Sequence, residues 1–192
     1  MENFNSLCVT SGNKKITTIN NLCCDFKVEV LCGCETQIDW RMVPRSRRFD
    51  KLFGMGTETR SVVAHNINER MLINQYGGCA IMAMSLISAE VQNTRVDSTG
   101  LGRWCWICLG SGQRKTRIVM AYQPSNSSRS SVGTTVKDQQ SQYFCARGDA
   151  RSPRTIFFEQ LITQLLLWKS INNNIVLLGN FNENVYTGRL AA

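Results

Sequence analysis

The sequence lacks any long apolar stretch. Its longest apolar runs, Cys79 to Met84 and Ile175 to Leu178, fall well short of the about 20 residues that a membrane-spanning helix needs. The first five residues contain no cationic segment followed by an apolar one, so no secretory signal is visible. Proline is scarce, with three residues, and 43% of the chain is apolar, which excludes a disordered protein. We therefore expect an intracellular protein without a membrane partner.

Histidine is nearly absent, and the cysteines do not form a regular pattern. The only histidine, His65, lies early in the chain, where a structural or loop role is favoured over catalysis. The nine cysteines form an odd count without the spacing of a secreted disulfide scaffold. Cys105 and Cys108 are three residues apart, so on a strand they face opposite sides and cannot share a zinc ion. Cys32 and Cys34 share a face, but no second ligand pair follows, which favours buried, reduced thiols.

Acidic residues are too few to balance the basic ones. The formal net charge is +8, and the excess lies after residue 40. Basic clusters suit a polyanion, because neutralised phosphates release counterions and add sequence-independent affinity. We expect Arg45, Arg47 and Arg48 to contact nucleic acid, although a solvated basic surface without a ligand explains the charge equally well. A second basic cluster comprises Arg147, Arg151 and Arg154.

Residue periodicity predicts a mixed α/β chain that forms one domain over residues 1–192. Helical spacing or capping residues predict three helices, of which the one that starts at Ser152-Pro153 has the clearest signals, a hydroxyl N-cap and a proline in the first turn. The polar, glycine-punctuated segment 41–59 predicts a long binding loop or insert. The other helices are expected at 14–24 and 136–145, the latter capped by Thr134 or Thr135, and strands at 28–32, 61–66, 78–88, 104–109, 116–122 and 175–178.

The strands at 104–109 and 116–122 are apolar on both faces. Because one face of an antiparallel hairpin is usually polar, burial on both faces predicts a sheet that is covered on each side. The segment from Gly110 to Gln113 is a suitable hairpin loop between them. Trp40, beside the basic segment, is the candidate for stacking on a base. The remaining tryptophans, Trp104, Trp106 and Trp168, lie on apolar elements and are assigned to the core.

Polar residues follow three of the predicted strands at their ends. Gly179-Asn180-Phe181-Asn182 comes directly after an apolar run, Cys34-Glu35-Thr36 follows an earlier strand, and Ala121-Tyr122-Gln123-Pro124 follows a third. Side chains at the ends of buried strands are where sheet enzymes commonly hold their functional groups. The three segments are therefore candidates for one functional site.

Together with Asn3-Phe4-Asn5-Ser6-Leu7 near the start, these segments resemble the motifs of the endonuclease/exonuclease/phosphatase family of metal-dependent phosphodiesterases. The resemblance is strongest to the endonuclease domains of non-LTR retroelements and spans nearly the whole chain. It implies an α/β fold, a four-layer α/β/β/α sandwich (DNase I-like) of two packed mixed sheets flanked by helices. Relative to the family pattern, we expect an opening strand before Asn3 and closing strands after Ala192 to be missing. The exposed sheet edges that result would favour association with another polypeptide.

The resemblance also implies a site and a cofactor. Glu35 and Asn3 would bind Mg²⁺ or Mn²⁺, and the catalytic set would be Glu35, Tyr122, Asn180 and Asn182. Asn5, Asn182 and Arg129 would hold the substrate phosphate, and the partner would be DNA, which suits a nuclear location. Hard oxygen ligands are those that Mg²⁺ prefers.

Two departures from the family pattern bear on activity. Asn180 occupies the position of the family's signature aspartate, and its amide cannot accept a proton near neutral pH. The family's terminal Asp-His pair has no counterpart before Ala192. We therefore expect a DNA-nicking endonuclease of retroelement type with impaired activity. The alternatives are a basic nucleic-acid-binding protein without catalysis and a phosphatase of the same family.

Overall fold

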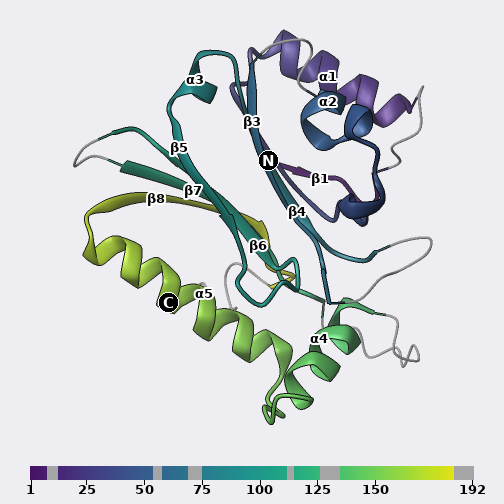
Figure 1. The fold of residues 1–192 in the computed structure, drawn as a ribbon, viewed down its shortest axis with the longest axis vertical. Coiled ribbons are helices and arrows are strands. Elements are labelled where there is room, and N and C mark those ends of the chain that lie inside the picture. Colours follow the sequence, from purple (N-terminus) through teal and green to yellow (C-terminus); the bar gives the residue numbers. More distant parts are fainter. Residues whose placement is uncertain (8–12, 54–57, 69–74, 112–114, 126–134, 184–192) are drawn as a thin grey trace.

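Two four-stranded sheets pack face to face, and helices lie on their outer sides (Figure 1). The computed structural model describes residues 1–7, 13–53, 58–68, 75–111, 115–125 and 135–183. The layers run helix, sheet, sheet, helix, which confirms the expected α/β/β/α sandwich. No described helix is both long and apolar enough to cross a membrane.

The first sheet has the strand order β1-β2-β4-β3. β1 pairs with β2 in parallel, and the other pairs are antiparallel. α1 and α2 lie on its outer face, on the upper right in Figure 1. The elements are β1 (Glu2–Asn3), α1 (Lys14–Asp25), β2 (Val30–Cys34), the short 3-10 helices η1 (Trp40–Met42) and η2 (Arg45–Arg47), α2 (Phe49–Phe53), β3 (Thr59–Ala64) and β4 (Cys79–Met84).

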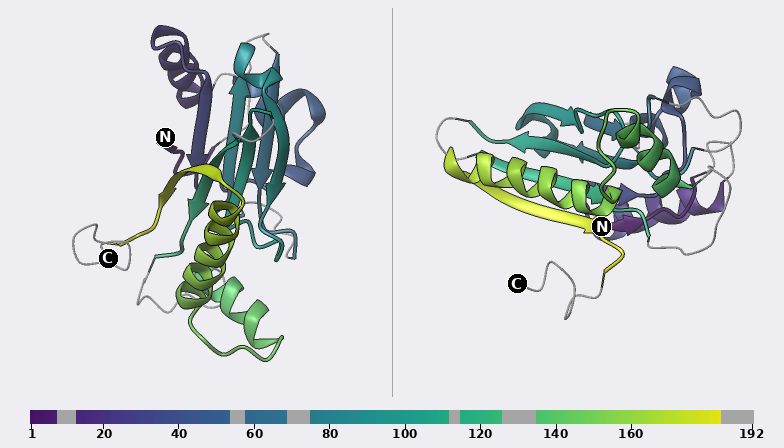
Figure 2. Two further views of the ribbon diagram at one scale, coloured as in Figure 1. Left: turned by 90° about the vertical axis from the view of Figure 1, so that its left-hand side faces the viewer. Right: turned by 90° about the horizontal axis from the view of Figure 1, so that it is seen from below.

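The second sheet has the order β5-β6-β7-β8, with antiparallel pairs except for the parallel pair β7 and β8. α5 runs along β8 on the outer face, and α4 follows the lower end of the sheets (Figures 1 and 2). The parallel pairing brings the ends of β7 and β8 to the same edge. The elements are α3 (Leu86–Ala89), β5 (Val91–Val96), β6 (Trp104–Leu109), β7 (Lys115–Tyr122), α4 (Val136–Cys145), α5 (Pro153–Ser170) and β8 (Asn173–Asn180).

The predicted burial of β6 on both faces is confirmed. Cys105 and Ile107 lie in the core between the two sheets and are fully buried. On the other face, Trp104 packs against Phe157 of α5, with the ring centroids 5.7 Å apart. Burial raises the pKa of the Cys105 thiol well above its usual value, which keeps the thiol protonated.

Local capping signals located the last two helices correctly. The Ser152 hydroxyl accepts a hydrogen bond from the Thr155 N–H, and Pro153 occupies the first turn of α5. The Thr135 hydroxyl accepts one from the Asp138 N–H at the start of α4. Both predicted starts are confirmed because each depends on residues that are neighbours in sequence.

The prediction of a long loop over 41–59 is wrong for its described part. This segment contains η1, η2 and α2, and Phe49 and Phe53 on α2 are buried against Phe4. Trp40 is only 4% exposed and packs on Phe49, so it cannot stack on a nucleic-acid base. Polar residues dominate the segment, but its few aromatic side chains fill the core under the first sheet.

Several strand bounds differ from those predicted, including β3, which spans Thr59–Ala64, and β8, which spans Asn173–Asn180. β2 starts two residues later than expected, because the Val28 N–H still bonds to the Cys23 carbonyl at the end of α1. β4 ends at Met84 and is followed by α3. β5 was not predicted, since its sequence Val-Gln-Asn-Thr-Arg-Val is mostly polar and it lies at the edge of its sheet. Association through such outer strands stays a prediction.

Candidate functional site

The segment after β2 and the segment after β1 meet at one edge of the first sheet. The parallel pairing aligns Asn3 with Cys34, the residue before Glu35. The Ser6 N–H then donates to the Glu35 carbonyl at 2.9 Å. The Asn3 side-chain oxygen accepts a hydrogen bond from the Asn5 N–H, also at 2.9 Å. The backbone segments that carry Asn3, Asn5 and Glu35 thus lie together at this edge, as the family resemblance implies.

Glu35 also contacts the second sheet. Asn180, the last residue of β8, donates a hydrogen bond from Nδ2 to Glu35 Oε1 at 3.1 Å. The two residues are 145 positions apart in sequence, so this contact joins the ends of both sheets. It is the central geometric feature of the candidate site.

Tyr122 lies at the same edge, because it pairs with Asn180 across β7 and β8. Burial is the main cause that raises the pKa of the Tyr122 hydroxyl, and the nearby negative charge of Glu35 raises it further. The hydroxyl therefore stays protonated at neutral pH and acts as a hydrogen-bond donor.

Asn182 is held by two hydrogen bonds. Its N–H donates to Asn180 Oδ1 at 3.1 Å, and its side-chain Nδ2 donates to the Gln123 carbonyl at 2.6 Å. Both ends of the Asn180 amide are therefore engaged, one by Glu35 and one by Asn182. Asn180 therefore links Glu35, which follows β2, to Asn182, which follows β8.

Gly179 allows β8 to approach β7 closely. A Cβ atom at this position would lie 2.4 Å from the Ala121 carbonyl oxygen, too close for any side chain. The glycine before Asn180 therefore has a packing role, which sets the position of Asn180 opposite Tyr122.

The structure adds two residues that the sequence analysis missed as site residues. Lys15 on α1 places its Nζ 2.7 Å from the Phe4 carbonyl and also reaches the carbonyls of Asn5 and Ser6. Arg154 on α5 is buried and donates to the Pro124 carbonyl at 2.6 Å and to Glu183 Oε1 at 2.9 Å. The Lys15 ammonium and the Arg154 guanidinium each bind backbone carbonyls of a loop at the site. Neither contact could be predicted from residues nearby in the sequence.

The second basic cluster is not a free cationic surface. Arg151 pairs with Asp149 and Glu159, and Arg154 is buried at the site. The guanidinium of Arg147 lies over the Tyr143 ring. By contrast, Arg45, Arg47 and Arg48 are exposed, as a nucleic-acid contact requires. Arg129 lies outside the described residues.

The donor set fits a divalent cation that keeps much of its water. Within the described ranges, no group of three or more His, Cys, Asp or Glu side chains could hold a metal ion. Glu35 offers one carboxylate, which the amide nitrogen of Asn180 faces. The amide oxygens of Asn3 and Asn180 accept hydrogen bonds from the Asn5 and Asn182 N–H groups. Gln123 is fully buried at this edge, and neither polar atom of its side chain has a partner among the described residues. Mg²⁺ commonly binds through one or two carboxylates with several waters, so Glu35 suffices for a weak site.

Comparison with solved structures supports the fold. No family model and no curated protein matches the sequence. The structure resembles a 3′ phosphatase, NExo, from Neisseria bound to a product DNA hairpin (TM-score 0.51, 20% identity, 94% of this chain and 55% of that chain). It also resembles an AP endonuclease from Archaeoglobus fulgidus (TM-score 0.50, 14% identity, 92% of this chain and 56% of that chain). A third similar structure is an endonuclease/exonuclease/phosphatase family protein from Leptotrichia buccalis (TM-score 0.53, 10% identity, 98% of this chain and 67% of that chain).

The structural neighbours are thus members of the endonuclease/exonuclease/phosphatase family, and the chain shares their DNase I-like fold. This chain spans only 55% and 56% of the first two proteins. At sequence identities of 10–20%, the structural similarity shows the fold alone, and the chemistry must be argued from the site residues.

Proposed function

We propose that the chain is a divalent-metal-dependent phosphodiesterase domain that acts on DNA, with nicking of the retroelement type impaired by Asn180. The observation that carries the proposal is the hydrogen bond from Asn180 Nδ2 to Glu35 Oε1, which joins strand ends of both sheets at one point. Tyr122 and Asn182 lie at the same point. Two of the structural neighbours, a 3′ phosphatase bound to a DNA hairpin and an AP endonuclease, favour a phosphoester substrate.

In this proposal Glu35 and the Asn3 amide oxygen hold Mg²⁺ or Mn²⁺. A bound metal would neutralise charge on the phosphoryl oxygens and lower the pKa of a coordinated water. Tyr122, kept protonated by burial, donates its O–H to a phosphate oxygen. The side-chain amide of Asn5 and the second Nδ2 hydrogen of Asn182, which its bond to the Gln123 carbonyl does not use, donate to the phosphate. The exposed Arg45, Arg47 and Arg48 contact the DNA backbone.

Asn180 limits the rate in this mechanism. Its amide orients Glu35 and Asn182 but cannot remove a proton from water. A general base typically contributes about 10²–10⁴-fold to rate, so we expect slow turnover. The lack of a general base at position 180 also favours a second candidate function, a protein that binds nucleic acid without cleaving it.

A nicking assay separates these candidates. Supercoiled plasmid is incubated with the protein in Mg²⁺, and binding to the same DNA is measured in EDTA. We expect slow, Mg²⁺-dependent nicking that disappears in Glu35→Gln and persists in Glu29→Gln, an exposed glutamate on the segment before β2. Binding without nicking would favour the non-catalytic candidate. Cleavage of a phosphomonoester together with weak, salt-insensitive DNA binding would favour a phosphatase.

A further inference from the structure

The outer edge of the first sheet is open at β3. This strand is the last in the order β1-β2-β4-β3, so it pairs with a neighbour on one side only. The Ser85 N–H donates to the Glu58 carbonyl, which fixes the alternation of hydrogen bonds between β3 and β4. By this alternation the N–H and C=O groups of Thr59, Ser61 and Val63 point away from β4. An unpaired edge of this kind can pair with another extended chain.

A cavity lies beside this edge, where β3 meets β5 of the second sheet. Both are outer strands, and they lie on the side of the sandwich that faces the viewer in Figure 1. The cavity volume of about 280 Å³ is just below the range of about 300–1,000 Å³ for small-ligand sites, so it suits single side chains. Val63 and Ala64 line it from β3. Ile67 and Val96, which also line it, are 55% and 43% exposed, so a bound chain can reach them.

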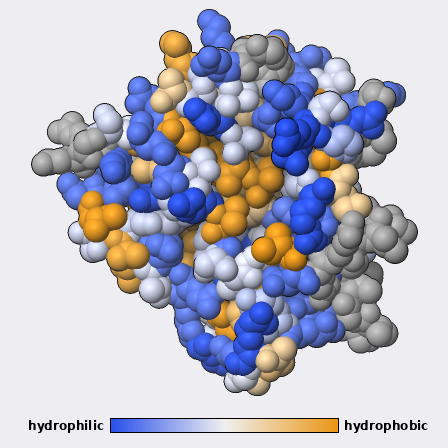
Figure 3. Space-filling view, viewed as in Figure 1, coloured by the Kyte–Doolittle hydropathy of each residue, from blue (hydrophilic) through white to orange (hydrophobic). Residues whose placement is uncertain are grey.

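The free charge around this cavity is positive. Arg95 on β5 lines it, and Arg60 precedes Ala64 by about 13 Å along β3. Both guanidinium groups are exposed, and neither forms an ion pair within the part of the chain that the structure describes. The carboxylate in the lining, Asp97, is buried and bound by Arg103. Figure 3 shows the same side of the molecule, on which apolar side chains gather in the middle and strongly hydrophilic ones surround them.

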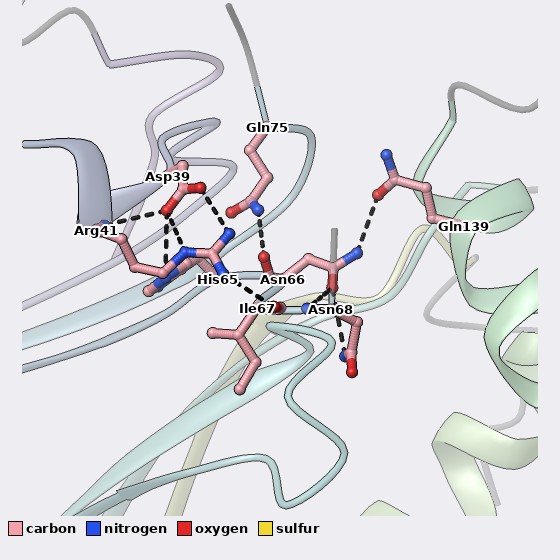
Figure 4. A network of polar contacts seen from close by, with 8 residues as sticks. All are labelled: Asp39, Arg41, His65, Asn66, Ile67, Asn68, Gln75 and Gln139. Atoms are coloured by element: carbon pink, nitrogen blue, oxygen red, sulfur yellow. Dashed lines mark hydrogen bonds and ion pairs between the residues drawn. The ribbon is translucent and has the colours of Figure 1, made fainter. Parts of the chain in front are cut away.

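The segment directly after β3 is held in place by contacts with other elements (Figure 4). Arg41 Nη1, from η1, donates to the Ile67 carbonyl at 2.9 Å. Asn66 Nδ2 donates to Gln139 Oε1 of α4 at 3.3 Å, and the Asn68 N–H donates to Asn66 Oδ1 at 3.0 Å. This end of the groove is therefore formed before a partner binds, which lowers the entropic cost of binding.

We propose that the free edge of β3 binds an extended acidic segment of another protein as an added antiparallel strand. The backbone of this segment bonds to the outward N–H and C=O groups of Ser61 and Val63. Side chains alternate along a strand, so every second one faces the same side as Val62, which packs between the two sheets. On that side an acidic residue opposite Arg60 and another near Arg95 flank an apolar residue opposite Val62.

A nucleic-acid strand matches this edge less well than a peptide does. The outward groups of Ser61 and Val63 alternate between donors and acceptors, as those of a peptide backbone do. The phosphate oxygens of a nucleic acid accept hydrogen bonds but offer no donor to the carbonyls. Binding of a peptide here does not depend on hydrolysis at Glu35, so this inference goes beyond the proposed function.

Fluorescence anisotropy in EDTA tests the proposal with a labelled, end-blocked peptide, Thr-Glu-Thr-Val-Thr-Glu-Thr. Its valine is placed opposite Val62, and its glutamates reach Arg60 and Arg95. We expect it to bind at least about tenfold more tightly than the same peptide with lysine in place of glutamate. N-methylation of the two threonines beside the valine removes the donors to the β3 carbonyls and keeps every charge, and it should weaken binding about tenfold or more.

Variants of the protein test the edge and the charge separately. Ser61→Pro removes one outward N–H and spares the hydrogen bonds to β4, since proline is tolerated where the N–H of an edge strand faces solvent. It should weaken peptide binding about tenfold, whereas Ser61→Ala, which keeps the N–H, should leave it unchanged. Arg95→Ala should weaken binding about two- to fivefold, as for an exposed ion pair. Arg147→Ala, which removes an exposed arginine after α4, is its matched control and should have no effect.

Equal binding of the N-methylated and the unmodified peptide would overturn the proposal, as would equal binding by Ser61→Pro and Ser61→Ala. Binding of a single-stranded oligonucleotide that Arg95→Ala weakens, without binding of the peptide, would overturn it in favour of nucleic acid. A dimer seen by light scattering that Ser61→Pro dissociates, again without peptide binding, would overturn it in favour of a second copy of the chain. Glu35→Gln separates the two proposals, because it should abolish nicking and leave peptide binding intact.

Discussion

Under the proposed function, Asn180→Asp should strengthen metal binding at Glu35 and raise the rate of DNA nicking by about 10²–10⁴-fold. In the wild type the Asn180 amide donates to Glu35 Oε1 at 3.1 Å. The substitution replaces this donor by a carboxylate oxygen, so two negative charges face each other. A divalent cation between them relieves the repulsion, and the new carboxylate is able to accept a proton from water.

The same variant should show a metal-dependent stability. Without metal, the two carboxylates repel each other when both are ionised, and this repulsion destabilises the folded state at pH 7.5 more than at pH 5. With Mg²⁺ at 100 times its dissociation constant, the folded state gains about 2.7 kcal/mol. Thermal unfolding at pH 5 and pH 7.5, with Mg²⁺ or EDTA, measures both effects.

The matched control is Asn174→Asp, which adds the same charge to an exposed position of β8. It should change neither nicking nor the response to Mg²⁺. Equal melting temperatures of Asn180→Asp in Mg²⁺ and in EDTA at pH 7.5 would contradict the assignment of this position to the metal site.

Arg103→Met should lower the free energy of unfolding by about 3–5 kcal/mol, because it leaves a buried carboxylate without its cation. Arg103 is 1% exposed, and its Nε and Nη2 lie 2.5 and 2.9 Å from the oxygens of Asp97. Nη2 also donates to Gln160 Oε1 on α5 at 2.6 Å, and the guanidinium lies 4.3 Å from the centre of the Trp104 ring. The residue therefore links the β5–β6 connection to the helix that covers the second sheet.

Urea denaturation gives the free energy of each variant. Arg151→Met is the matched comparison, since it makes the same substitution at an exposed arginine that pairs with Asp149 and Glu159. Exposed ion pairs contribute little, so its midpoint should change far less than that of Arg103→Met. Similar midpoints for the two variants would show that the buried pair has no special role in stability.

The parts of this fold that could be predicted depend on neighbours in sequence. Ser152 and Pro153 mark the start of α5 by local rules, and the apolar run before Gly179 marks β8. The motif order also predicted that Glu35 and Asn180 would share one edge, and Asn180 Nδ2 lies 3.1 Å from Glu35 Oε1.

The parts that could not be predicted depend on contacts between distant residues. Phe49 and Phe53 lie in a polar, basic segment, and packing against Phe4, which is distant in sequence, makes this segment part of the core. Lys15 and Arg154 resemble ordinary surface cations in the sequence, yet each binds backbone carbonyls of the site. Ile162 and Leu166 on α5 are apolar, yet both are exposed.

The central claim is that Glu35, supported by Asn180 from the other sheet, binds one divalent cation. Electron paramagnetic resonance of free Mn²⁺ measures this most directly, because bound ions leave the free-ion signal. The account predicts one Mn²⁺ bound per chain in the wild type and in Glu29→Gln, and loss of this binding in Glu35→Gln. Undiminished Mn²⁺ binding by Glu35→Gln would contradict it.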